Sequence, residues 1–191
     1  MYQIKLVQDR VRIPPTLFGS DMEDAVLHIV RERYEGRIYR DLGIVLSINE
    51  PKVLSEGMVI PGDGGAYYTV NFNALTFMPI VNEIYRAEVK EIVEFGAFSS
   101  IGPFQGLLHV SQIGKDKFFF DKKTKALSSK GGMNVKKGDE ILVKVSTVSL
   151  KSTSSDTKIG LTMRPDGLGK PEWMDKKKAE PKKVEKKADK K

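Results

Sequence analysis

The sequence predicts an α+β N-terminal domain, made of a strand, a helix and antiparallel strands, followed by an all-β five-stranded barrel. Apolar residues recur at helical spacing in one segment of the first eighty residues and with a period of two in most of the others. Near residue 81 a second series of short strands begins, with glycine at its bends. A chain of 191 residues is long enough for two small domains. We therefore expect domains at 1–80 and 81–168, and a lysine-rich, disordered tail at 169–191.

The composition excludes several kinds of site. Cysteine is absent and the only histidines are His28 and His109, so disulfides, thiolate zinc sites and histidine-rich metal sites are excluded. We expect no cofactor. The chain contains no long apolar run and begins without a basic segment followed by an apolar core. These features predict a soluble, cytoplasmic protein that does not contact the membrane.

The formal net charge of +7 is unevenly distributed. Residues 170–191 carry +5, residues 81–169 carry +4 and residues 1–80 carry −2. Only the middle of the chain is therefore a moderately basic folded region, which is a weak argument for nucleic-acid binding because solvated lysines are common on protein surfaces.

The first domain begins with a predicted strand and helix. Alternating apolar residues predict a strand over 1–13, which Pro14 ends because proline cannot donate to a continuing ladder. Ser20 and Glu23 have the spacing of a capping box, and Gly36 is placed to end the helix. The apolar residues of the helix extend over about half its circumference, so we expect it to be covered from two sides.

Three further strands are predicted at 44–48, 52–60 and 66–80. The last two are joined by residues 61–65, with the sequence PGDGG, which predicts a hairpin tip because glycine adopts positive φ freely. A phosphate-binding loop is the less favoured alternative, since such a loop needs a helix after it.

The second domain is predicted from five short strands, at 86–90, 97–101, 104–110, 141–146 and 158–164. We expect these strands to pair antiparallel and to close into a small barrel of the OB type. The long connection at 114–134 contains lysines on both sides of the three adjacent phenylalanines Phe118–Phe120. This segment either seals the end of the barrel or offers aromatic side chains to stacked bases, and both alternatives remain open.

Six motifs resemble, in order, the OB-fold RNA-binding repeat of the large S-one ribosomal protein. They are Ala87-Glu88-Val89, Phe95-Gly96-Ala97-Phe98, Gly106-Leu107-Leu108-His109-Val110-Ser111, Lys137-Gly138-Asp139, Val143-Lys144-Val145 and Leu161-Thr162-Met163-Arg164. The resemblance implies an RNA surface that contains Phe95, Phe98, His109 and Arg164. Of the two phenylalanines at the predicted bend, we expect Phe95 to be the more buried. Lys90 and Lys144 are expected to add phosphate contacts.

The strand, helix and Pro-Gly-Asp-Gly-Gly-Ala-Tyr-Tyr hairpin before this barrel resemble the family of the E-prime subunit of archaeal DNA-directed RNA polymerases, the counterpart of the seventh subunit of the eukaryotic enzymes. The resemblance implies a stalk protein with no catalytic site of its own, which forms a heterodimer with the polymerase F subunit and binds nascent single-stranded RNA. It also implies docking on the polymerase core through Gly62, Asp63, Gly64 and Gly65. The alternative is a free-standing RNA-binding factor in translation or RNA decay.

Overall fold

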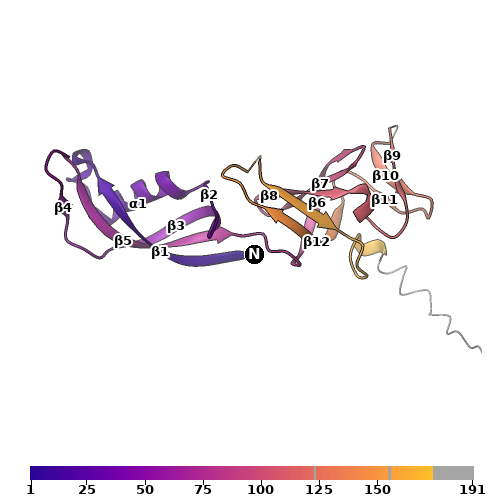
Figure 1. Cartoon of the computed structure of the whole chain (residues 1–191), viewed down its shortest axis with the longest axis horizontal. Helices are drawn as coiled ribbons and strands as arrows, with labels where there is room; N and C mark the ends of the chain where they lie inside the picture. The colour runs from indigo at the N-terminus through magenta and orange to yellow at the C-terminus, as the bar shows by residue number, and fades with distance from the viewer. Residues whose placement is uncertain (123, 155, 174–191) are drawn as a thin grey trace, which may run out of the picture. The chain divides into compact units, whose positions relative to one another are not determined.

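The structure is a computed structural model that describes residues 1–122, 124–154 and 156–173. The chain divides into two compact units: Met1–Glu83 with Val148–Ile159, and Ile84–Thr147 with the described residues of 160–173. Figure 1 shows the elements of each unit. The disorder predicted for the end of the tail concerns residues outside the described part of the chain.

The first unit is built on one antiparallel sheet. Its strands are β1 (Tyr2–Ile13), β2 (Ile38–Tyr39), β3 (Gly43–Val53), β4 (Met58–Val59) and β5 (Ala66–Phe77). The order is β1-β5-β3-β2, and β4 pairs with the start of β5. The predicted break between residues 48 and 52 is wrong, because β3 continues through it with register shifts, and Glu50 takes a positive φ of 54° there.

Helix α1 (Met22–Tyr34) follows a single 3-10 turn, η1 (Pro15–Leu17), and lies along one face of the sheet in Figure 1. Its N-cap is Asp21 rather than the predicted Ser20, because the Asp21 carboxylate accepts the amide N–H groups of Glu23 and Asp24. The predicted stop is confirmed: the helix ends just before Gly36, which has a φ of +74°.

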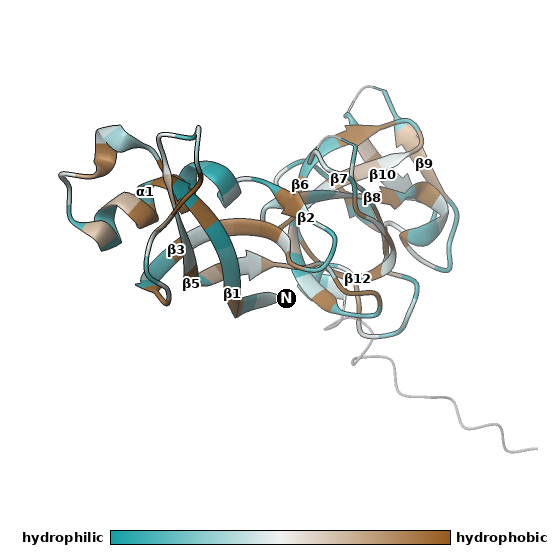
Figure 2. Ribbon diagram, turned by 60° about the vertical axis from the view of Figure 1, so that its left-hand side comes forward, coloured by the Kyte–Doolittle hydropathy of each residue, from teal (hydrophilic) through white to brown (hydrophobic). Residues whose placement is uncertain are grey.

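Only one side of α1 is fully buried within its unit. Val26 and Val30 have no exposed surface and pack with Phe72 of the sheet. Burying a side chain of this kind stabilises the fold by about 1.5–3 kcal/mol. Hydrophobic and hydrophilic segments alternate along the helix in Figure 2. Leu27 and Ile29, which widen the apolar arc, are half-buried, so the expected second cover is not provided by this unit.

Strand β1 changes the phase of its apolar residues halfway along. Val11 and Ile13 face the core, whereas Tyr2, Ile4 and Leu6 belong to the opposite, exposed set of alternate positions. Ile4 and Leu6 are 74% and 70% exposed. The first half of β1 therefore presents large apolar side chains to solvent at the edge of the sheet.

The second unit contains the closed barrel predicted from the sequence. Its strands are β6 (Ile84–Val93), β7 (Gly96–Ile101), β8 (Phe104–His109), β12 (Glu140–Ser149) and β13 (Lys158–Thr162), in the order β12-β13-β8-β7-β6. The expectation that all pairs are antiparallel is wrong for β8 and β13, which run parallel, with Gly160 opposite Leu107. Ala97, Leu108 and Val143 are among the fully buried residues of the barrel.

The long connection folds as a small sheet of its own. After the 3-10 turn η2 (Val110–Gln112), the strands β9 (Phe118–Asp121), β10 (Ala126–Ser129) and β11 (Asn134–Val135) pair in the order β11-β10-β9. Residues 169–173, which the sequence assigned to the tail, lie on this unit: Gly169 bridges to Leu142, and Trp173 lies 6.2 Å from Phe118 between ring centroids.

Candidate nucleic-acid interface

The hairpin of β7 and β8 positions the central residues of the predicted RNA surface. Its register places Phe98 opposite Leu107 and Gly96 opposite His109. Ala97 points into the barrel and is fully buried, so Phe98, its neighbour in the strand, points outward and is half-buried. The hairpin therefore brings Phe98 to the outer face of the barrel and His109 to the end of the same strand pair.

Gly96 allows the two strands to approach closely at this end. A Cβ atom at this position would lie 2.3 Å from the carbonyl oxygen of Leu108, which no side chain tolerates without a shift of the backbone. Next to this contact, the Val110 amide donates to the Phe95 carbonyl over 2.9 Å. The turn that carries Phe95 is thereby held against the segment that follows His109.

Phe95 and Phe98 form an edge-to-face pair with ring centroids 6.4 Å apart. Phe95 is 50% exposed and Phe98 is half-buried, so the expectation that Phe95 is the more buried residue is wrong. The reason is local: Phe95 lies in the turn between β6 and β7, whereas Phe98 lies within β7 between Glu91 and Leu107 of the neighbouring strands. Phe95 offers the more open ring surface of the two.

His109 caps the turn η2. Its Nδ1 accepts the amide N–H of Ser111 over 3.2 Å and lies 2.8 Å from the Ser111 hydroxyl oxygen. Because the amide can only donate, Nδ1 acts as the acceptor, and in the neutral ring the donor is Nε2. The cap orients an exposed imidazole at the end of β8.

Arg164 lies at the same end of the barrel because the two residues before it are hydrogen-bonded to Gln112, the last residue of η2. The Met163 amide donates to the Gln112 carbonyl over 2.7 Å, and the Thr162 hydroxyl lies 2.9 Å from the Gln112 side-chain oxygen. These bonds place the exposed Arg164 beside η2. Phe95, Phe98, His109 and Arg164, which lie far apart in the sequence, are thus arranged around one end of the β7–β8 hairpin.

The two predicted lysines lie differently. Lys90 is next to Glu91, the partner of Phe98, but its ammonium group is 2.7 Å from the Glu88 carboxylate, which offsets its charge. Lys144 of β12 lies opposite Ile84, at the other end of β6 from the turn with Phe95. The structure therefore brings Lys90 near Phe98, although its charge is paired with Glu88. It does not bring Lys144 to this end of the barrel.

A shallow hollow beside Arg164 contains residues that the sequence analysis left out of the site. Val110 and Ser111 of η2 line it, together with Lys115, Lys117 and Phe119 of the following segment. The lysines next to three adjacent phenylalanines at 115–120 were a signal for these residues, but the sequence did not show which ring is exposed.

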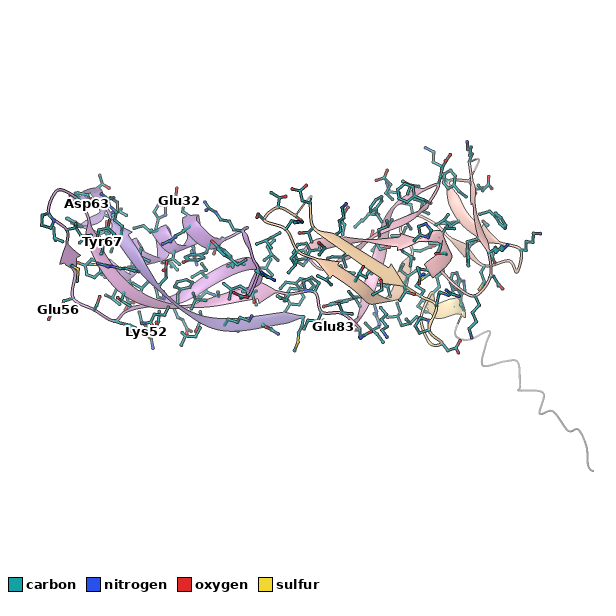
Figure 3. The ribbon with its side chains drawn as sticks, viewed as in Figure 1. Glu32, Lys52, Glu56, Asp63, Tyr67 and Glu83 are labelled. Carbon is teal, nitrogen blue, oxygen red and sulfur yellow. The ribbon has the colours of Figure 1, made fainter. Side chains whose placement is uncertain are left out.

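The predicted docking tip is the hairpin loop between β4 and β5. Asp63 accepts hydrogen bonds there from Arg12 Nε (2.9 Å), the Tyr67 hydroxyl (2.7 Å) and the Gly65 amide (3.0 Å). The bond from Arg12, followed by that from Tyr67, holds the pKa of the Asp63 carboxyl well below its usual range. Figure 3 shows Asp63 and Tyr67 together at this end of the unit. Asp63 therefore organises the loop from within.

Apolar side chains surround this loop on its outside. Leu54 and Ile60 are exposed, as are Met58 and Val59 of β4, which sequence reasoning counted only as strand residues. The run Met58-Val59-Ile60 directly before Pro61 was the signal that pointed to them. An exposed apolar cluster of this kind is typical of a surface that a partner covers.

Neither a metal centre nor a membrane span is found in residues 1–122, 124–154 and 156–173. These residues include no group of three or more histidine, aspartate or glutamate side chains that could hold a metal ion. Among the same residues no helix is long and apolar enough to cross a membrane.

Two family models match the chain. Residues 8–64 match the "SHS2 domain found in N terminus of Rpb7p/Rpc25p/MJ0397", and residues 78–159 match the S1 RNA binding domain. The chain is 37% identical to the DNA-directed RNA polymerase subunit Rpo7 of Saccharolobus shibatae, over 91% of this chain and 97% of that protein. The Rpo7 subunit of Sulfolobus acidocaldarius is 34% identical over 91% of this chain and 95% of its own length. The DNA-directed RNA polymerase III subunit RPC8 of Saccharomyces cerevisiae is 33% identical over 50% of this chain and 45% of that protein.

Proposed function

The chain belongs to the Rpo7 family of DNA-directed RNA polymerase subunits, and we propose that it is a non-catalytic stalk subunit that binds nascent single-stranded RNA on its barrel. The observation that carries the proposal is the arrangement of Phe95, Phe98, His109 and Arg164 around one end of the β7–β8 hairpin. The polymerase chemistry belongs to other subunits of the complex, and this chain works with them in the cytoplasm.

Stacking and phosphate contacts explain how this face binds RNA. A base stacked on an aromatic ring contributes about 1–3 kcal/mol and is accepted whatever its identity. Phe95 and Phe98 supply two rings set edge to face, and the exposed Arg164 supplies a cation for a phosphate. Binding of this kind is weak, tolerates any RNA sequence and allows a transcript to slide along the surface.

Single-stranded RNA binding tests this proposal. We expect Phe95→Ala, Phe98→Ala and Arg164→Ala to weaken binding by about fivefold or more each. Phe18→Ala is the matched control, because Phe18 is also 50% exposed but belongs to the first unit. Unchanged affinity in all three barrel variants would place the RNA site elsewhere.

The domain at 1–80 is proposed to dock on the polymerase core through Gly62–Gly65 and the apolar side chains around them, Leu54, Met58, Val59 and Ile60. The exposure of these side chains supports the proposal, because burying them in an interface removes apolar surface from water. The domain at 81–168, together with residues 169–173 that lie on it, binds the RNA, and the rest of the predicted tail has no assigned role.

The proposed partner in the stalk is the F subunit of the polymerase. The exposed apolar half of β1, with Tyr2, Ile4 and Leu6, supports a covered surface on the first unit. Ile4→Glu combined with Leu6→Glu is expected to abolish co-elution with this partner, whereas Gln8→Glu, an exposed position on the same strand, leaves it unchanged. A double variant that still co-elutes would move the partner to another surface.

The free-standing RNA-binding factor is the less favoured function. The Rpo7 relatives match nearly their whole length, including the N-terminal unit that a lone S1 barrel lacks. Purification from the native cells under mild salt tests this choice, and we expect polymerase subunits to accompany the chain.

A further inference from the structure

The three adjacent phenylalanines of β9 have different environments. Phe118 is buried and packs against Trp173, whereas Phe119 is 53% exposed and Phe120 is half-buried. Alternation along the strand explains the difference, because β9 pairs with β10 and turns Phe118 and Phe120 to one face and Phe119 to the other. Phe118 therefore seals the end of the unit, and Phe119 has no packing role of that kind.

Phe119 lines a hollow of about 310 Å³, in which charged side chains and Ser111 lie beside Val110, Gly114 and Phe118. Lys115, Lys117 and Arg164 contribute cations to it, and Asp116 contributes one acidic side chain. Lys115 also pairs with Asp166 over 3.2 Å, so Lys117 and Arg164 provide the less compensated positive charge. A single exposed ring among cations suits a flat, anionic ligand.

The hollow is continuous with the proposed RNA face. Arg164 belongs to both, and Ser111, which lines the hollow, is hydrogen-bonded to His109. Strand β9 also lies against the turn η2 that His109 caps. A strand of RNA that leaves Phe95 and His109 along η2 therefore reaches Phe119 next.

We propose that Phe119 is a further base-stacking platform, and that Lys117 and Arg164 hold the phosphates of the nucleotide stacked on it. The inference rests on the proposed RNA-binding function and extends it by one nucleotide position. The occupant is the same single-stranded RNA rather than a protein, because the hollow is small, carries net positive charge and continues the face that contains Phe95 and His109.

RNA length separates this subsite from the main face. Binding of the full chain is measured with oligouridines of about 4 and about 12 nucleotides, the range that a single barrel of this type covers. Phe98→Ala is expected to weaken binding of both. Phe119→Ala is expected to weaken binding of the longer RNA by about fivefold or more and to leave the shorter one unchanged. Phe119→Tyr, which keeps a ring, restores the affinity.

The lysine provides an independent readout. Lys117→Ala is expected to lower the slope of log K against log salt for the longer RNA by about 0.7, the value for one phosphate contact on a single strand. Normal binding of the longer RNA by Phe119→Ala, with Phe98→Ala still defective, would overturn the subsite alone. Normal binding by both variants would place the RNA site on another surface, which would overturn the proposed binding face together with the subsite. Loss of polymerase association in Phe119→Ala, with RNA binding intact, would make this surface a protein contact and also overturn the inference.

Discussion

Arg12 at the end of β1 and Asp63 in the hairpin loop are 51 residues apart in sequence and are joined by a forked ion pair. Arg12 Nε lies 2.9 Å from one Asp63 oxygen and 3.1 Å from the other, and a second guanidinium nitrogen, Nη2, also donates to the carboxylate. The Tyr67 hydroxyl donates to the same carboxylate. The pair ties the loop that we propose as a docking element to the sheet behind it.

Asp63→Ala is expected to loosen the loop without unfolding the unit, because the carboxylate lies outside the apolar core. Amide hydrogen exchange at 62–66 should become faster, and binding to the polymerase core should weaken several-fold, since the loop must then be ordered on binding. Glu56→Gln is the control, because Glu56 is an exposed carboxylate on the neighbouring loop. A normal exchange rate in Asp63→Ala would contradict the organising role.

The low pKa of Asp63 makes this loop resistant to acid. A carboxyl whose pKa is lowered by folding stabilises the fold at every pH above its unfolded pKa, and that contribution is lost as the pH falls through the lowered value. As the pH is lowered, we expect the Asp63 carboxyl to stay unprotonated after ordinary aspartates have been protonated. Its carboxyl NMR signal should therefore shift at a lower pH than theirs. Arg12→Gln removes the largest cause and should return the midpoint towards the ordinary range.

Asp63 also shows what the sequence reveals and what it does not. The glycine-rich turn and the strands beside it are local patterns, so they predicted the hairpin. The partner of Asp63 is on β1, and nothing near residue 63 points to Arg12. The same limit applies to Phe119, because only the pairing of β9 with β10 decides which of three adjacent rings faces solvent.

At the start of α1, the sequence offers two adjacent residues for the same N-cap position. Ser20 and Asp21 are both good caps one residue apart, and Ser20 has the better pattern because Glu23 follows at capping-box spacing. The backbone places Asp21 at the cap, where its carboxylate reaches two amides. In contrast, the barrel was predictable because its alternation extends over five strands, and His109 ends one of them while Arg164 lies just after another.

Tyr34 is expected to ionise late. Burial, followed by the 2.6 Å hydrogen bond that its hydroxyl donates to Asp9, raises the pKa of Tyr34 from 10.0 to about 12. The stabilisation is fully present below the unfolded pKa and is lost as the pH rises from about 10 through about 12. An alkaline absorbance titration of Tyr34→Phe should lack one late-ionising tyrosine. If the variant instead lacked a tyrosine that ionises near pH 10, the assignment of the late-ionising group to Tyr34 would be contradicted.

Gly43, at the start of β3, is expected to be the least replaceable glycine of the first unit. Its φ is +78°, and a Cβ atom there would lie 2.2 Å from the Phe77 carbonyl oxygen. Gly36 has a similar φ of +74° with open space around it, so Gly36→Ala measures the backbone strain alone. That strain costs about 1–2 kcal/mol for an L-residue in the left-handed region.

Gly43→Ala adds a steric clash to the same strain, because β3 and β5 are paired where Ile44 faces Phe77 and neither backbone can move without breaking the ladder. We expect its loss of unfolding free energy to be at least twice that of Gly36→Ala. Chemical denaturation, monitored by the helical circular dichroism signal of α1, measures the unfolding free energies of both variants. Equal losses in the two variants would mean that the β3–β5 ladder yields to the added methyl group, and that the close approach at Gly43 does not constrain the sheet.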